Sequence, residues 1–594
     1  MTAELQTEKR LDGVALAVLG KRMEAIVRTM QTTLVKTGRS GVLNTAKDCS
    51  CCIVSAGNEM VVMAESLPCH VISGPDLQSA NMQALHPNLR PGDAFLHNSP
   101  YDGNSHAADH VILVPVFSSD GVHRFTTVVK AHQADCGNAI PTTYSVNARD
   151  VYEEGALIFP CVKVQEDYTD RDDILRMCRA RIRVPDQWWG DYLAMIGAAR
   201  IGERRLLALG EEVGWDTLES GVTEWLDYSE RRMTEVLTKI PSGRATARTK
   251  HDPTPSDPDG VELSVTVETH GEDGTIDIDL TDNPDCLPSG LNLTEATSRA
   301  AALIGVFNGI DPTVPQNSGS ARRVNVRLRE NCCVGIPVHP VSCSVATTNL
   351  LDRIANAVSR AFAEISEQAG RAETGLSFPI STGVISGHDP RNGGQPFIHQ
   401  MFTGWTGGAG GARADGWLTN CGVGDGGALQ RDSVEINELR FPIWIRSERL
   451  VPDSEGAGQF RGAPSAEVEF GPTEGELDVV VGSDGSINPA LGARGGKAGA
   501  AATQYRRTVE GELRPVDPFS HVVLSPGETL VGTSCGGGGY GRPEHRDPER
   551  VAWEVREGWI TMERAHSEYR VAVRPDGTLD EQETERLRDG FDGK

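Results

Sequence analysis

The residues best suited to chemistry gather in two short stretches of the chain, "HNSPYDGNSHAADH" and "AHQAD". Each stretch contains a His-x-x-Asp pair, namely His106 with Asp109 and His132 with Asp135. A pair with this spacing can place an imidazole and a carboxylate on one side of a turn, where both can bind one ion. Imidazole and carboxylate together suit divalent cations such as Zn²⁺, Mn²⁺, Fe²⁺ or Co²⁺. The two pairs therefore raise the hypothesis of a divalent-metal site.

A polar loop without chemistry is the alternative, in which the carboxylates cap turns and the imidazoles are only hydrogen-bonded. A single His-x-x-Asp pair favours that alternative, whereas two pairs beside adjacent strands support either interpretation equally. His97 lies next to a predicted strand end and is expected to be structural, whereas His70 in "LPCHVISGP" fits either role. Asp48 in "KDCSCC" is expected to open a strand, unless the fold turns it inward to the metal.

Other catalytic and nucleotide-binding motifs receive no support from the sequence. Its G-x-S-x-G match, "GTSCG" at 532–536, runs into further glycines rather than a helix, so it does not form the nucleophile elbow of a serine hydrolase. It contains no G-x-x-x-x-G-K-[ST] phosphate loop, and "GGAGGARADG" follows no predicted strand, so its likeness to a dinucleotide fingerprint is loose. The sequence therefore gives no support for nucleotide binding by this chain itself.

Charge and hydropathy argue against two classes of partner. The 594-residue chain has a formal net charge of −26 and no basic stripe of the kind that nucleic-acid binding needs. Its longest apolar runs, such as "VILVPVF", fall far short of the roughly 20 residues of a membrane-spanning helix. The N-terminus is charged and helix-periodic, unlike a signal peptide. We therefore expect a cytoplasmic protein with no nucleic-acid and no membrane partner.

Thirteen cysteines are scattered through the chain, and they do not supply the two C-x₂-C pairs of a zinc ribbon. In a long chain without a secretory signal, such cysteines are expected to be reduced thiols, most of them buried.

The elements around the two His-x-x-Asp pairs should bring them together. Residues 93–135 are predicted to form a strand, a long polar loop, a second strand, a tight turn at "SSDG", a third strand and a loop. Two strands joined by a tight turn are neighbours in a sheet. We therefore predict that the loops at 97–110 and 132–138 lie in contact.

The rest of "HQADCGN" is expected to support the ligands. Cys136 and Gln133 should point away from the metal, with Gln133 orienting a ligand through its amide. Gly137 and Asn138 should turn the backbone sharply, since both residue types tolerate positive φ.

The hydrophobic pattern predicts a multi-domain chain of class α+β, with hairpin-built sheets and a glycine-rich, strand-rich C-terminal part. We expect three parts, at 1–245, 246–400 and 401–594, with a loop or domain boundary at 240–260. The other predicted elements are helices at 13–37, 76–86, 292–310 and 347–370, hairpins at 49–66 and 261–282, and helices through 171–245 with a break near 182–192. The helix at 347–370 should end at Gly370. Glycines beyond 400 are interpreted as positions where backbone packs closely or approaches a ligand.

The chain resembles the hydantoinase B/oxoprolinase family, that is, the B-type subunits of ATP-dependent hydantoinases and lactamases. The family also includes the metal-bearing subunits of acetone and acetophenone carboxylases. The matching motifs run in order along nearly the whole chain: "KDCSCCIVSAGNEMVV", "LPCHVISGP", "RPGDAFLHNSPYDGNSHAADHVILVPVF", "HQADCGN", "EEGALIFP", "IRVPDQWWGDYLAMIGAARIGERRL", "EINELRFPIWIRSERLVPDSEGAGQFRGAP" and "CGGGGYGRPEHRDP".

The resemblance implies an A-type partner subunit that binds ATP in an actin-like domain and phosphorylates the substrate carbonyl. The two subunits would form a heterotetramer or a larger assembly. The B-type subunit would complete the hydrolysis of the activated cyclic amide, such as a lactam, a hydantoin or an oxoproline-like ring, at a site holding Zn, Mn or Fe.

The resemblance also implies residue roles. By motif position, the metal ligands of the carboxylases in this family map to Asp109, His132 and Asp135, and His106, in the same motif as Asp109, is the expected fourth ligand. Asp48 is a further ligand candidate. An imidazole that does not bind the metal could move the proton, and the candidates for this catalytic role are His106, His110 and His70.

Two other functions stay open. Many hydantoinase-type relatives have H-H-A-D-I-G-G where this chain has "HQADCGN", and the H-Q pair resembles the carboxylase branch, whereas the chain length is nearer the hydrolase branch. The first alternative is therefore an ATP-dependent ketone carboxylase of the acetone or acetophenone type. The second is a non-catalytic scaffold for the A-type subunit.

Overall fold

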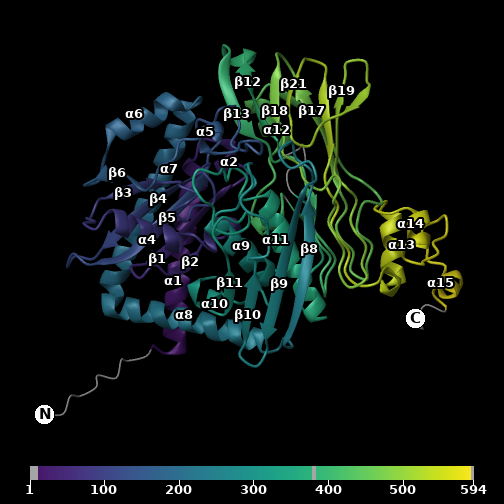
Figure 1. Ribbon diagram of the computed structural model, residues 1–594, viewed down its shortest axis with the longest axis horizontal. Helices are drawn as coiled ribbons and strands as arrows, with labels where there is room; N and C mark the ends of the chain where they lie inside the picture. Colours follow the sequence, from purple (N-terminus) through teal and green to yellow (C-terminus); the bar gives the residue numbers. More distant parts are fainter. Residues whose placement is uncertain (1–10, 377–382, 420, 590–594) are drawn as a thin grey trace.

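A computed structural model describes residues 11–376, 383–419 and 421–589 (Figure 1). Helices and several sheets follow one another along the chain, and within these described ranges all but one of the pairings between named strands are antiparallel. In Figure 1 the N-terminal region is purple to blue, the middle is teal, and the C-terminal region is green to yellow. The predicted α+β class with hairpin-built sheets is confirmed.

The N-terminal region is built on a seven-stranded sheet in the order β2-β1-β5-β4-β3-β6-β7. Its strands are β1 (Cys49–Ser55), β2 (Met60–Met63), β3 (Ala94–His97), β4 (Asp109–Phe117), β5 (His123–His132), β6 (Val162–Glu166) and β7 (Thr169–Asp170). Residues Ile112, Val114 and Val129 on one face pack in a common core with helices α1 (Gly13–Thr37) and α7 (Pro185–Val213). On the other face, Val111 and Val128 pack with helix α4 (Pro75–Leu85). Both faces are covered, which explains the continuous apolar runs of β4 and β5.

The helical stretch after this sheet has the predicted break. Helix α6 (Asp172–Arg181) ends before Ile182, and α7 begins at Pro185, whose fixed φ suits a first helical turn. Helix α8 (Trp215–Leu237) follows Gly214, which has a φ of 86°. Four short helices fill connections: α2 (Gly41–Asn44), α3 (Pro68–Val71), α5 (Val151–Glu154) and α10 (Ser318–Ala321).

The middle region is a four-stranded sheet in the order β11-β10-β9-β8, with helices α9 (Glu295–Phe307) and α11 (Asn349–Ile365) packed together beside it. Its strands are β8 (Gly243–His251), β9 (Val261–His270), β10 (Thr275–Asp279) and β11 (Val324–Arg327). The predicted loop at 240–260 is therefore wrong for its first half. Strand β8 was missed because its sequence, "GRATARTKH", is largely polar, although it pairs with β9 over its whole length.

The predicted helix end at Gly370 is also wrong. Helix α11 ends at Ile365, and Ser366 is its C-terminal cap. Gly370 has a φ of 74°, and a Cβ there would overlap the backbone of Ala363 and Ser359. Glycine is required at this position by the left-handed conformation and the close backbone approach, four residues beyond the cap.

The C-terminal region contains two larger sheets, in the orders β13-β12-β18-β21 and β16-β17-β22-β19-β20, and a small β14-β15 pair. The strands are β12 (Val384–Asp389), β13 (Gln395–Gln400), β14 (Thr406–Gly407), β15 (Leu418–Thr419), β16 (Ile443–Leu450), β17 (Ala466–Pro472), β18 (Leu477–Val480), β19 (Thr503–Arg507), β20 (Leu513–Pro515), β21 (His521–Leu524) and β22 (Thr529–Thr533). The helices are the 3-10 turns η2 (Pro390–Asn392), η3 (Val423–Asp425) and η4 (Pro543–His545), together with α12 (Val434–Arg440), α13 (Pro548–Arg556), α14 (Met562–Ser567) and α15 (Glu581–Arg588).

Glycine-rich segments in this region bind one another directly through their backbones. The central segment is 535–541, and the N–H groups of its four consecutive glycines donate to carbonyls on three other segments: Gly536 to Ala500, Gly537 to Ala463, Gly538 to Glu373 and Gly539 to Lys497. A Cβ on Gly462 would overlap the carbonyl of Gly537. The interpretation of these glycines as positions of close backbone packing is confirmed.

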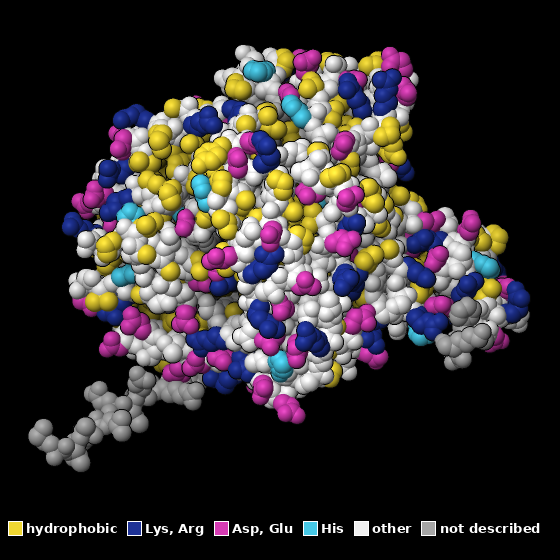
Figure 2. Space-filling view, in the orientation of Figure 1, with side chains coloured by type: hydrophobic (Ala, Val, Ile, Leu, Met, Phe, Trp, Pro, Cys, Tyr) yellow, Lys and Arg dark blue, Asp and Glu magenta, His cyan; other side chains and the backbone are white. Residues whose placement is uncertain are grey.

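The surface and the cysteines agree with the sequence analysis. On the face seen in Figure 2, acidic and basic side chains are interspersed, and helices α13–α15 form a projection at the right. All thirteen cysteines are free thiols, and all but Cys286 are buried, as predicted. Among the described residues, none of the helices combines the length and apolar character of a membrane span.

The predicted boundary at 245/246 falls inside β8, and the one at 400/401 falls at the end of β13. The sheet that contains β13 is completed by β18 and β21, so it joins the second and third parts. We keep the three-part division as a proposal.

Candidate metal centre

The register of β4 and β5 places Asp109 directly opposite His132. Facing residues of an antiparallel pair project from the same face of the sheet. The Oδ1 atom of Asp109 lies 3.0 Å from Nδ1 of His132, and both side chains are almost fully buried. The predicted contact between the loops at 97–110 and 132–138 is therefore present.

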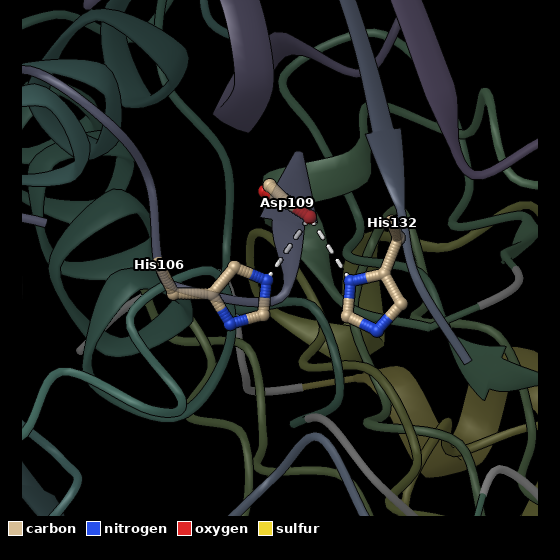
Figure 3. A group of neighbouring side chains, drawn as sticks. All are labelled: His106, Asp109 and His132. Carbon is tan, nitrogen blue, oxygen red and sulfur yellow. Dashed lines mark hydrogen bonds and ion pairs between the residues drawn. The ribbon is translucent and has the colours of Figure 1, made fainter. Parts of the chain in front are cut away.

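His106 completes a group of three at this point. It lies in the loop before β4, and its Nε2 is 3.1 Å from Oδ1 of Asp109. Its Nδ1 donates a hydrogen bond of 2.7 Å to the carbonyl of Ser344. Figure 3 shows both imidazoles pointing toward the same carboxylate oxygen, and the two rings stack with centroids 5.1 Å apart.

A layer of hydrogen bonds holds this group in place. The hydroxyl of Ser105 donates to Oδ2 of Asp109, and the buried Nζ of Lys130 donates to Ser105 over 3.2 Å. On the other side, Nε2 of His132 lies 3.0 Å from Oγ1 of Thr143. Such outer partners fix the orientation of ligating side chains.

His70 and Asp48 lie beside the group. Nε2 of His70, in α3, is 3.2 Å from Oδ2 of Asp109 and 3.5 Å from Oδ1 of Asp48. Asp48 precedes β1 and is only 4% exposed. The fold therefore turns Asp48 inward, which was the condition for a role at the metal.

Burial and neighbouring charges set the protonation of these side chains. Burial acts to raise the pKa of Asp109, but His106 and His70 outweigh it and hold that pKa well below its usual value. Burial acts to lower the pKa of His106, but the Asp109 carboxylate holds it above the usual value. Burial, together with Asp109 and Asp425, raises the pKa of Asp48 well above its usual range.

This arrangement fits a divalent cation. One ligand atom from each of His106, Asp109 and His132 lies within 4.8 Å of the others. Among the described residues, Nε2 of His106 and Oδ1 of Asp48 have no hydrogen-bond partner, although both atoms are buried. Because Nδ1 of His106 is the donor, Nε2 is the atom left for an ion. A cation would also relieve the repulsion between the buried carboxylates.

Asp135 contacts Arg183 and Gly137 rather than the three-residue group. Its Oδ2 accepts from the backbone N–H of Arg183, and its Oδ1 accepts from the Arg183 side chain and from the N–H of Gly137. Strand β5 ends at His132, so by Asp135 the chain has turned toward the start of α7. We therefore leave Asp135 out of the proposed ligand set and include His106 in it.

His110 lies on the opposite face of the sheet from Asp109. It neighbours Asp109 on β4, and successive residues of a strand face opposite sides of the sheet. His110 accordingly packs beside Phe159 and Trp188, whose Nε1 donates to it over 3.3 Å. Burial lowers its pKa to about 3. The structure thus places His110 in an aromatic core, away from the proposed ligands.

The supporting residues of the motif follow the predictions only in part. The amide of Gln133 points away from the cluster, as predicted, but it donates to the carbonyl of Ala131 rather than to a proposed ligand. Gly137 has a φ of 83°, whereas Asn138 has no positive φ, so the sharp turn needs the glycine alone. His97 is hydrogen-bonded to backbone through both ring nitrogens, as expected of a structural histidine.

Several residues of the site were missed in the sequence. Lys130 had a visible signal, because it follows two valines near the end of β5 and alternates with His132, so the two share a face. Ser105 had none beyond its place in a polar loop. Tyr144, which stacks on His132 with centroids 5.3 Å apart, and Gln400 come from distant segments, so only the fold could reveal them.

Comparisons with known proteins agree with the motifs. The family described as hydantoinase B/oxoprolinase matches residues 12–543. The beta chain of the caprolactamase of Pseudomonas jessenii is 30% identical over 587 residues, which cover 97% of this chain and 99% of that protein. A protein described as a subunit of a D-/L-hydantoinase, from Pseudomonas sp. (strain NS671), is 27% identical and covered over 98% of each chain.

Solved structures share the fold. The crystal structure of the ATP-dependent caprolactamase from Pseudomonas jessenii superposes with a TM-score of 0.87 and 28% identity, over 97% of this chain and 99% of that one. Nucleotide-free acetone carboxylase superposes with a TM-score of 0.85 over 98% of this chain and 83% of that one; at 17% identity, this is a likeness of fold alone. From the family match and the near-complete alignment with its relatives, we conclude that the chain belongs to the hydantoinase B/oxoprolinase family.

Proposed function

We propose that this chain is the metal-bearing B-type subunit of an ATP-dependent cyclic amide hydrolase. The observation that carries the proposal is the buried cluster of His106, Asp109 and His132, in a chain that aligns along its whole length with a caprolactamase subunit. The substrate would be a lactam, a hydantoin or an oxoproline-like ring. It would be activated by phosphorylation on a partner before this chain completes the hydrolysis.

Phosphorylation would overcome the low reactivity of a cyclic amide toward water. Phosphorylation of the amide oxygen makes the ring carbon electrophilic, so that water can add to it. The ring C–N bond then breaks with proton transfer to the nitrogen, and a second water releases phosphate from the acyl phosphate that remains. A divalent cation, when bound, would supply Lewis acidity at this point. The absence of a phosphate loop from the sequence agrees with ATP chemistry on the partner.

The residues of this chain have separate roles in the proposal. His106, Asp109 and His132 would hold the cation, and Asp48 is the candidate for a fourth ligand. The hydrogen bond from His106 to the Ser344 carbonyl fixes the ring so that Nε2 faces the ion. His70 is the candidate for proton transfer, because its Nε2 faces the cluster without belonging to the three-ligand group.

Elemental analysis of the purified complex tests the metal site. His132→Ala and Asp109→Asn should each lose most of the metal and the turnover while the complex still assembles. His388→Ala, at an exposed histidine of β12, is the matched control and should keep both. Full metal occupancy and activity in both ligand variants would show that the cluster is structural.

The partner is part of the proposal. The relatives are described as subunits, which implies a second chain. We propose an A-type subunit with an actin-like ATP-binding domain, in a heterotetramer or a larger symmetric assembly. Because the reaction consumes ATP, we also propose a cytoplasmic location. Copurification with mass measurement of the complex, and cell fractionation, test these statements.

A ketone carboxylase is the second candidate, and its support is the fold shared with acetone carboxylase. Identity to the caprolactamase structure is higher, at 28% against 17%, and favours the hydrolase. ATP turnover that requires bicarbonate and a ketone would identify the carboxylase. A native complex that is free of metal and inactive on both substrate classes would identify a scaffold.

A further inference from the structure

A small closed cavity adjoins the candidate metal centre. Its volume is about 10 Å³, which is room for about one water. All three regions of the chain contribute to its wall, which includes His70, His132, Tyr144, Thr347, Thr348, Gln400, Cys421 and Asp425. A group held in this cavity would lie beside the proposed metal ligands.

Gln400 is the most unusual residue of this wall. It is the last residue of β13 and is 1% exposed. Within the described part of the chain, neither its Oε1 nor its Nε2 has a hydrogen-bond partner. Its amide approaches Tyr144, without reaching hydrogen-bond geometry. A buried carboxamide with both polar atoms unsatisfied is costly, so a ligand that satisfies both is indicated.

The start of α11 faces the same cavity. Thr347 and Thr348 line it, and they immediately precede the first residue of the helix. The N-cap, Thr348, makes no side-chain cap, because its hydroxyl proton faces the Val345 carbonyl and Oδ1 of Asn349 instead. The N-terminus of a helix carries partial positive charge and N–H donors. It would favour negative charge that develops on an oxygen of the substrate.

We propose that this cavity is the subsite for the amide group of the cyclic substrate, and that Gln400 recognises its ring nitrogen. The inference rests on the proposed function. In a small ring the amide is cis, so its N–H and C=O point to the same side and can pair with the Oε1 and Nε2 of a carboxamide. After phosphorylation of the oxygen, the ring nitrogen has a lone pair and no proton. Nε2 of Gln400 can then donate to it.

This arrangement discriminates a cyclic amide from a ketone. An activated ketone has a carbon atom where the activated amide has its ring nitrogen, so Nε2 of Gln400 would stay buried without an acceptor. Leaving such an atom unsatisfied reduces kcat/KM by roughly 10- to 100-fold. Gln400 therefore favours the hydrolase over the carboxylase on grounds that are independent of sequence identity.

The size of the cavity limits how the substrate arrives. A ring is larger than one water, so part of the wall must move. Residues Cys421 and Asp425 face the cavity, whereas Gly422, Val423 and Gly426 line a cleft of about 780 Å³. This short segment is shared by both spaces. The substrate would reach Gln400 from the cleft when the segment shifts.

The test uses the full complex of this chain with its ATP-activating partner and a panel of lactams, hydantoins and oxoproline. Gln400→Leu removes both polar atoms, and Gln400→Glu keeps the shape but offers only acceptors when it is ionised. Gln395→Leu, at an exposed position of the same strand, is the matched control. The readouts are kcat and KM, the amide opened per ATP hydrolysed, the metal content and the assembly of the complex.

Gln400→Leu is expected to lower kcat/KM for cyclic amides by roughly 10- to 100-fold. It should also lower the number of rings opened per ATP, while metal content and assembly stay at wild-type levels. Wild-type kinetics and coupling in both Gln400 variants would overturn the inference and leave the proposed function standing. A wild-type complex that opens no cyclic amide would overturn the proposed function, and this inference with it.

Discussion

Replacement of Gly537 by alanine tests the backbone packing of the C-terminal region. Gly537 lies in the middle of the central glycine segment. Its N–H donates to the carbonyl of Ala463 over 3.0 Å, and its own carbonyl accepts from Gly456 over 2.8 Å. A Cβ at this position would overlap the carbonyl of Gly408. That carbonyl cannot simply move away, because it accepts from the N–H of Ala463 over 2.8 Å.

The cost follows from these contacts. Overpacking in a rigid interior typically costs about 1–3 kcal/mol. Relief of the overlap would also weaken one or two of the backbone hydrogen bonds, at about 1 kcal/mol each. We therefore expect Gly537→Ala to destabilise the C-terminal region by about 2–5 kcal/mol. Side-chain rotation offers no relief, since the methyl group is attached directly to the backbone.

Gly197→Ala is the matched control, with an effect of opposite sign. Gly197 lies within α7, and a Cβ there would meet no atom within 4 Å. Alanine in a helix interior is favoured over glycine by about 1 kcal/mol, so this variant should be slightly more stable. Urea unfolding midpoints and limited proteolysis report both effects, without assuming two-state behaviour in so long a chain. Equal midpoints for Gly537→Ala and wild type would refute the packing argument.

Three further predictions concern the site, the pH and the partner. Ser105→Ala removes the hydrogen bond to Asp109 and should weaken metal binding by roughly 10- to 100-fold in a chelator competition, whereas Ser118→Ala, in the turn at the far end of β4, should not. Burial lowers the pKa of His97 to about 4 and that of His110 to about 3, so the folded state keeps both neutral while the unfolded state takes up protons below about pH 6.5. Stability should therefore fall as the pH falls from about 6.5 toward 4, and His110→Phe should flatten that decline in urea midpoints; an unchanged slope would contradict the assignment. The isolated chain should hydrolyse no ATP above background until the partner is added, and substrate-dependent ATP hydrolysis by the chain alone would contradict the division of labour.

The parts of the fold that sequence predicted well have strong local patterns. The apolar stripe of α1 and the tight turn between β4 and β5 each identify an element without tertiary information. Strand β8 was not predicted because its largely polar sequence lacks the alternating apolar pattern of a strand. Its pairing with β9 is made by backbone hydrogen bonds, which do not depend on that pattern. The end of α11 was misplaced because Gly370 serves a close backbone contact, and sequence alone does not separate that use from a helix cap.

Some residues of the candidate site could likewise be predicted from local patterns, and others could not. The pairing of Asp109 with His132 follows from two strands and a turn, so sequence could predict it. The positions of His106 and Asp135 depend on the path of the chain before β4 and after β5, which sequence does not specify. The repeated His-x-x-Asp spacing suggested that both pairs face the metal, whereas in the fold only the first pair does. Asp135 forms an ion pair with Arg183, and no local sequence pattern predicts that partner. Gln400 was out of reach because its environment, rather than its neighbours in sequence, makes it unusual.

The position of the site has a consequence for how metal and substrate are coupled. The proposed ligands come from the N-terminal region, the backbone carbonyl that orients His106 comes from Ser344 in the middle region, and Gln400 ends β13, in the sheet that joins the middle and C-terminal parts. A ligand cluster kept by the N-terminal region alone would lack the partner that fixes His106 and the amide that faces the substrate. Metal binding should therefore stabilise the contacts between regions as well as the cluster itself, because an ion that binds only the assembled state favours that state by mass action. The same contacts bring the start of α11 and Gln400 to the ion, so the geometry that holds the metal is also the geometry that would select a cyclic amide.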